Sequence, residues 1–259
     1  MATNDIWLAG EIPRSDRASR IFLPLRCLGC RAMNLRFTAV LPLALAIVAA
    51  LAATALGAMV GIYRNGMDTT AQRSQMVKLV GRSCERGGSQ EALRFVVGKR
   101  TGECAFRTPV LGRDLEIAAT ERLLSGTPQA MQKKAFLGLA LRAGGGSRYQ
   151  LAVYPLQQKV QLRKVLSDGQ IKYLQIVKEV STVGGLNKAN ALRLSAINVA
   201  PGEARLLAKV RGKAVIDVTD PSAGELSGRA SAVSAGAANN GVGVVASVDD
   251  VVIRVPSPF

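Results

Sequence analysis

Carboxylates at alternate positions are the residues of this chain whose spacing comes nearest to a catalytic arrangement. Asp114 and Glu116 lie two residues apart in the stretch DLEIAATE, so an extended strand would place both side chains on one face. Such a pair can serve as nucleophile and acid on the two sides of a glycosidic bond. Glu121 is too distant to join this array, and the neighbours Asp249 and Asp250 would point to opposite faces. We therefore interpret these acids as solvated strand and turn positions and predict no catalytic residue.

The chain contains no histidine, which limits its chemistry further. Serine or cysteine hydrolases that use an imidazole base are excluded, as are histidine-ligated metal sites. Cys27 and Cys30 form a lone CxxC, a weak signal for zinc, and we interpret them as incidental or as lipid-modified beside a membrane. We expect no cofactor, with calcium as the alternative. The loop carboxylates that could converge on such an ion are Asp217, Asp220 and Asp249.

Residues 37–63 carry no charge. As a helix this segment would measure about 40 Å, which exceeds the roughly 30 Å hydrocarbon core of a bilayer. Arginines concentrate in residues 1–36, and only Arg64 follows closely, so we predict a short basic cytoplasmic N-terminus and a single-pass signal anchor at 37–63. Alternatively, translation begins at Met33 and the segment is a signal peptide, with a passable cleavage site at 55–57. In that case the protein would be secreted.

The remaining chain is expected outside the membrane. We interpret residues 64–83 as a polar stalk and residues 84–259 as the folded domain. Cys84 and Cys104 would lie in an oxidising compartment, where disulfides persist. A bond between them would close a loop of about twenty residues, worth roughly 3 kcal/mol in the chain-entropy model. We predict this disulfide, and the alternative is two unpaired buried thiols.

Short apolar segments separated by Gly, Pro, Asn or Asp run through the folded domain. This pattern predicts an all-β sandwich or barrel. In RYQLAVYP, Tyr149, Leu151 and Val153 share one face, which we assign to the core. In the last segment we expect the core side to hold Asp249, Val251, Ile253 and Val255. The predicted strands are 92–97, 103–110, 114–123, 135–143, 148–155, 159–166, 171–180, 191–199, 204–210, 213–219, 228–236 and 246–255.

Residues 190–255 resemble the C-terminal half of concanavalin A-like jelly rolls of the laminin-G-like and keto-disaccharide-hydrolase-like type. The resemblance, with an upstream hairpin, covers about half of the chain and implies a concanavalin A-like β-sandwich. The final signature of the family has Phe where this chain has Val248, and its usual opening strand is not recognisable, so we identify a divergent member whose activity does not follow automatically. The residues that carry the resemblance are Arg211-Gly212-Lys213, Val215, Asp217, Asp220, Gly228-Arg229 and Val248-Asp249-Asp250, with Gly138, Leu139, Arg142, Tyr149 and Leu151 upstream.

The binding partner is predicted from aromatic content and charge. Trp7 is the only tryptophan, so sugar stacking in the outer domain would depend on tyrosines such as Tyr154 and Tyr173. The formal net charge is +16, which attracts polyanions such as acidic polysaccharides and cell-envelope polymers. Nucleic acid is not expected, because the topology separates the domain from it and no aromatic–basic interleaving is present. The turn Arg211-Gly212-Lys213 is interpreted first as a hairpin closure with Gly212 at positive φ, and second as a basic rim.

From these features we predict a membrane-anchored, extracytoplasmic β-sandwich that acts as a binding module for glycans or acidic envelope polymers. The residues predicted to contact the ligand are Arg211, Lys213, Tyr154 and Tyr173. Two alternatives remain: a divergent glycoside-processing hydrolase of the keto-disaccharide type, and a purely structural envelope protein.

Overall fold

The computed structural model describes residues 58–81, 83–89, 92–98, 102–237 and 243–257. The predicted cytoplasmic segment 1–36, with Trp7, Cys27 and Cys30, lies outside these residues, as does the predicted anchor up to residue 57. None of the helices in the described ranges combines the length and apolar character needed to span a bilayer.

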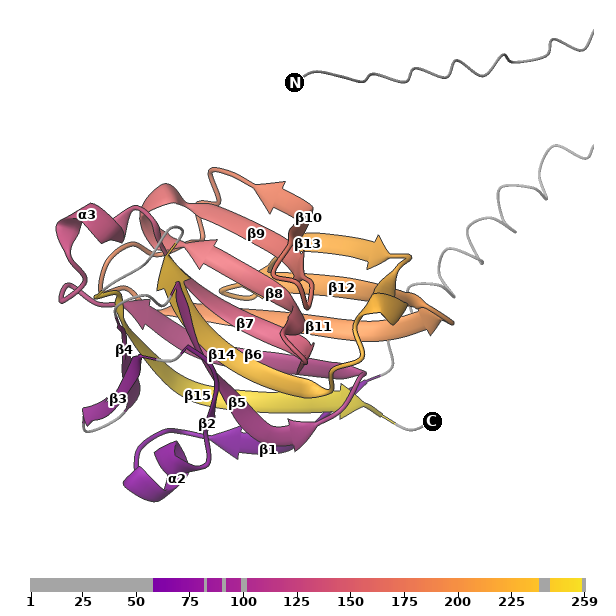
Figure 1. Cartoon of the computed structure of the whole chain (residues 1–259), viewed down its shortest axis with the longest axis horizontal. Helices are drawn as coiled ribbons and strands as arrows, with labels where there is room; N and C mark the ends of the chain where they lie inside the picture. The colour runs from indigo at the N-terminus through magenta and orange to yellow at the C-terminus, as the bar shows by residue number, and fades with distance from the viewer. Residues whose placement is uncertain (1–57, 82, 90–91, 99–101, 238–242, 258–259) are drawn as a thin grey trace, which may run out of the picture. The chain divides into compact units, whose positions relative to one another are not determined.

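The described strands form two antiparallel sheets that lie one over the other (Figure 1). Sheet A has eight strands and sheet B has seven. The order of sheet A is β13 (Lys213–Asp220), β12 (Glu203–Val210), β11 (Asn190–Ala200), β6 (Leu115–Leu123), β15 (Val245–Pro256), β4 (Ala92–Val97) and β3 (Cys84–Ser89), and β1 (Met59–Asn65) also pairs with β15. The order of sheet B is β10 (Ile171–Val177), β9 (Lys159–Val165), β8 (Ser147–Tyr154), β7 (Ala135–Gly144), β14 (Ala230–Ala237), β5 (Glu103–Leu111) and β2 (Val77–Val80).

Short helices connect some of these strands. The α-helices are α2 (Thr70–Ser74) and α3 (Gln129–Gln132), and the 3-10 helices are η1 (Pro155–Gln157) and η2 (Ala223–Glu225). The all-β prediction is therefore confirmed, and each of the twelve predicted strands is present with its ends shifted by at most a few residues.

Alternate residues of the strands fill the space between the sheets. Tyr149, Leu151 and Val153 of β8 are fully buried in the core, as their alternation predicts. In β15 the prediction is wrong at one position, because Asp249 does not face the core. The backbone of Asp250 has a φ of 50°, and the pairing with β6 shifts between Asp249 and Val252. This β-bulge changes the alternation, so that around it Val248, Val251 and Ile253 are buried in the core.

The predicted boundaries before residue 84 are also corrected. Met59–Asn65 forms β1, so the end of the predicted anchor belongs to the sandwich. The predicted stalk, 64–83, contains α2 and β2. A capping box formed by Thr69 and Gln72 marks the start of α2, and β2 pairs with β5. Met67 and Met76 are fully buried in the core and hold this polar stretch in place. The sandwich therefore includes residues from Met59 onward.

The predicted disulfide between Cys84 and Cys104 is present. Cys84 lies in β3 of sheet A, and Cys104 lies in β5 of sheet B. The bond therefore joins the two layers.

Candidate functional site

The outer face of sheet B gathers polar and aromatic side chains from neighbouring strands. Arg163 of β9 lies opposite Gln150 of β8 on one side and opposite Tyr173 of β10 on the other. Directly opposed residues point to the same face of a sheet. Because the alternate residues Tyr149 and Leu151 fill the core, this face is the outer one. We call it the polar face and define it by Glu103, Phe136, Arg148, Gln150, Tyr154, Gln161, Arg163 and Tyr173.

A continuous hydrogen-bond network crosses the polar face. Arg163 Nε donates to Gln150 Oε1 at 2.8 Å, and Gln150 Nε2 donates to Glu103 and, at 3.1 Å, to Ser234 Oγ. Arg148 forms an ion pair with Glu103. Gln150 is fully buried beneath its neighbours. The network therefore holds these planar polar groups in fixed positions across β5, β14, β8 and β9.

Two polar atoms of this face have no hydrogen-bond partner among the described residues. They are Arg148 Nε, a donor, and Gln161 Oε1, an acceptor, and both are buried. Buried polar atoms are nearly always hydrogen-bonded to protein or to ordered water. These two atoms are therefore exceptions in a face whose other polar groups are bonded.

Two aromatic rings of the polar face are covered by cations. The ring centroids of Phe136 and Tyr154 lie 5.8 Å apart. The guanidinium of Arg163 lies 4.9 Å from the Phe136 centroid, and Lys159 Nζ lies 4.2 Å from the Tyr154 centroid. Burial raises the pKa of Tyr154, although Arg163 opposes this shift. Tyr154, predicted as a stacking platform, is therefore packed within the face.

Tyr173, the other predicted platform, is open. Its side chain is 54% exposed on the edge strand β10. By strand pairing, Ile171 and Ile176 lie on the same face, and both are also exposed. An aromatic ring with apolar neighbours next to fixed polar groups can accept the apolar face of a sugar ring while the polar groups bind its hydroxyls.

Arg211 and Lys213 belong to the other sheet, in and after the turn between β12 and β13 of sheet A. Arg211 has a φ of 49° and Gly212 a φ of 81°, so the predicted two-residue turn is present. The Arg211 guanidinium donates to the carbonyl of Ala189 at 2.6 Å and 3.1 Å, which makes it an anchor for the preceding loop. Lys213 is exposed and lines a pocket of about 240 Å³ with Thr182.

The carboxylates considered for catalysis are not brought together as a pair. Asp114 Oδ1 accepts from the backbone N of Asn198 at 2.8 Å, and Glu116 is ion-paired with Arg254 at 2.7 Å. Glu121 lies on the core face of β6, where burial raises its pKa well above the usual value.

The carboxylates considered for calcium are also separated. Asp217 forms a bidentate pair with Arg205, whereas Asp220 is buried in the core beside Lys164. Asp249 lies in β15, in the middle of the same sheet. In the described part of the chain, no three His, Cys, Asp or Glu side chains are grouped as metal ligands would be.

Sequence reasoning missed most of the polar face. Arg148 and Gln150 alternate with core residues in β8, as do Gln161 and Arg163 in β9. The available signal was two consecutive predicted strands with long polar side chains at alternate positions, which an ordinary solvated face also produces. The structure adds that these side chains are buried and that Glu103 and Gln150 link Arg148 to Arg163 through hydrogen bonds.

Comparison with known proteins identifies the fold. No protein-family model matches the sequence, and no curated protein sequence matches it. A protein of unknown function with a galectin-like fold from Bacillus subtilis superposes with a TM-score of 0.53 at 10% identity, over 76% of this chain and 98% of that one. The carbohydrate recognition domain of Emp46p, in its metal-free form, gives 0.50 at 13% identity, over 77% and 97%. Bacillus licheniformis beta-glucanase gives 0.50 at 11% identity, over 76% and 99%. The chain therefore has the galectin-like, concanavalin A-like jelly-roll fold that its sequence resembles.

Proposed function

We propose that this protein is a membrane-anchored, extracytoplasmic module that binds a glycan on the polar face of sheet B. The observation that carries the proposal is the exposed ring of Tyr173, which lies beside Arg163 among the bonded polar groups of the same face. Sugar hydroxyls both donate and accept hydrogen bonds, so the polar groups around this ring suit them. The carbohydrate recognition domain of Emp46p, which has the same fold, adds general support.

The small number of carboxylates on the polar face favours binding over hydrolysis. Glycosidic cleavage normally requires two carboxyl groups that flank the scissile bond. Among the described strand residues that share this face, Glu103 carries the one carboxylate, and it is bonded to Arg148 and Gln150. A carboxylate held in this way fixes the network and lacks a partner for acid–base work.

Charge favours an acidic glycan or envelope polymer. The chain has 34 Lys and Arg against 18 Asp and Glu. On and beside the polar face, Lys159, Arg163 and Arg148 outnumber Glu103. A field of this sign raises the local concentration of polyanions, and salt screens it over roughly 10 Å.

The location is inferred from two features. The Cys84–Cys104 disulfide fits an oxidising compartment. The uncharged run that begins at Phe37 fits a membrane anchor that leaves the sandwich outside, or a cleaved signal that releases it. The membrane is then a partner through the N-terminal segment, and nucleic acid is not an expected ligand.

The test is an array of neutral and acidic glycans probed with the full-length chain at low and physiological salt. We expect binding to acidic glycans that weakens with salt. Tyr173→Ala should lower the affinity about tenfold through lost stacking, whereas Tyr173→Phe should retain it. Gln161→Leu should also lower the affinity, because the face loses a polar side chain opposite Ile176 in the strand next to Tyr173.

Two results would overturn this proposal. Binding that both Tyr173→Ala and Gln161→Leu leave unchanged would remove the polar face from the glycan site. If the wild-type chain binds no glycan on the array, the purely structural role is favoured.

A further inference from the structure

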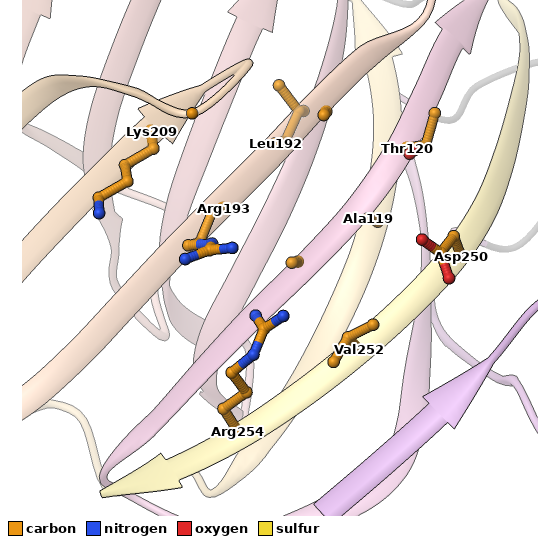
Figure 2. Close-up of a pocket in the computed structure, with 11 residues that line it drawn as sticks. Ala119, Thr120, Leu192, Arg193, Lys209, Asp250, Val252 and Arg254 are labelled. Carbon is orange, nitrogen blue, oxygen red and sulfur yellow. The ribbon is translucent and has the colours of Figure 1, made fainter. Parts of the chain in front are cut away.

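A second cluster of charged side chains lies on the opposite side of the sandwich, on the outer face of sheet A. Arg193 of β11 and Arg254 of β15 point toward each other from the two sides of β6 (Figure 2). Between them Glu116 Oε1 accepts from Arg254 Nη1 at 2.7 Å and lies 3.5 Å from Arg193 Nε. Lys209 of β12 completes the group. We call Glu116, Arg193, Lys209 and Arg254 the arginine pocket.

The positive charge of this pocket exceeds the negative charge that it holds. Glu116 is the one buried carboxylate shared by the two guanidinium groups. Asp250 also lines the pocket, but Arg64 binds it at 3.0 Å and balances its charge. Lys209 forms no hydrogen bond or ion pair with any described residue, and neither Nη atom of Arg193 has a partner within those ranges. Two cationic groups thus have donors available for an anion.

The pocket has space for a small group. Ala118 and Ala191 line it, and their short side chains leave room between the arginines and Lys209. Two adjoining hollows of about 180 Å³ and 300 Å³ share Arg193, Lys209 and Arg254 as walls. The second is also lined by Ser195, whose hydroxyl can bond to a ligand, and by the apolar side chains of Ile197 and Leu207. A ligand of about the size of one sugar ring, with a charged group, fits such a lining.

We propose that the arginine pocket binds the oxyanion group of a small acidic ligand, a carboxylate or a phosphate. The planar guanidinium of Arg193 suits the two oxygens of either group, and Lys209 adds a second charge from the neighbouring strand. Glu116 keeps the arginines in place without neutralising all of the charge. This site is independent of the polar face, because it belongs to the other sheet.

The test is isothermal titration of the full-length chain with sodium glucuronate, inorganic phosphate and glucose at low salt. We expect glucuronate or phosphate to bind with a dissociation constant in the millimolar range, and glucose not to bind. Arg193→Gln should weaken this binding about tenfold, and Lys209→Met should weaken it about three- to tenfold. Each variant removes a charge-assisted hydrogen bond to the anion. The better of the two anions then identifies the source of the oxyanion.

A matched variant separates this site from the effect of general charge. Lys78→Met removes one exposed positive charge from β2 in sheet B and should leave binding of the anions unchanged. The proposal is overturned if neither anion binds, if glucose binds equally well, or if Lys78→Met weakens binding as much as Lys209→Met.

Discussion

Lys164 and Asp220 form a buried ion pair that crosses from sheet B to sheet A, with 2.7 Å between Lys164 Nζ and Asp220 Oδ2. The side chains are 1% and 2% exposed. The hydroxyl of Tyr149 donates to the same carboxylate oxygen at 2.6 Å. Burial alone would raise the pKa of Asp220, but hydrogen bonds from Lys164, Tyr149 and Ser222 outweigh it and hold the pKa below its ordinary value. The end of β9 is thereby fixed to the end of β13.

We expect Asp220→Asn to lower the free energy of unfolding by about 3 kcal/mol, because Lys164 loses a buried counter-ion. Asp217→Asn is the control on the same strand: its pair with Arg205 is partly exposed and should contribute less than about 1 kcal/mol. Urea unfolding followed by circular dichroism measures both. Since the pKa of Asp220 is lowered, the wild-type advantage should be present at neutral pH and lost as the pH falls below 3.8. Equal losses for the two variants would contradict this account.

Glu121 should change the pH dependence of stability in the direction opposite to that of Asp220. Burial raises its pKa well above 4.5, one oxygen accepts from the backbone N of Gly138 at 2.9 Å, and the other has no partner among the described residues. The folded protein therefore holds a proton that the unfolded chain releases, and wild-type stability falls as the pH rises above 4.5. Glu121→Gln removes this penalty, so its stability relative to wild type should increase from pH 4 to pH 8. A difference that is constant across this range in denaturant unfolding would refute the interpretation.

The two arginines around Glu116 should differ in their contribution to stability. Arg254 contacts the carboxylate at 2.7 Å, whereas Arg193 lies at 3.5 Å and is more exposed. We expect Arg254→Met to cost about 2 to 3 kcal/mol, because the buried carboxylate keeps only the weaker partner. Arg193→Met should cost less than about 1 kcal/mol. Thermal and urea unfolding of the two variants, compared side by side, test this ranking, and a larger cost for Arg193→Met would reverse it.

The strands were predictable because each has alternating apolar residues between clear turn signals, as in β8 and β12. The elements before residue 84 were not predictable in this way. Met59–Tyr63 continues the uncharged run that begins at Phe37, so composition does not separate this strand from the predicted anchor. The polar stretch after it packs into the core through Met67 and Met76. The bulge at Asp250 was also hidden, because one extra residue inverts the alternation without a change in composition.

The site was less predictable than the fold. Tyr173 could be proposed from sequence because aromatic residues are rare in this chain, which leaves few candidates for stacking. The bonding of Glu103, Gln150 and Arg163 depends on the register of strands that lie far apart in sequence, such as β5 and β8. The sequence pattern of a single strand does not determine how that strand is aligned with its neighbours. The same holds for the arginine pocket, whose two arginines come from β11 and β15.

The bond between Cys84 and Cys104 has a consequence for the integrity of the chain. It closes a ring of residues that contains β4 and joins a strand of each sheet. A protease that cut the backbone once between residues 85 and 103 would leave both fragments covalently attached. The nicked protein would migrate as an intact chain until a reductant separated it into two pieces, so damage in this ring would not release the sandwich from whatever holds its N-terminal end.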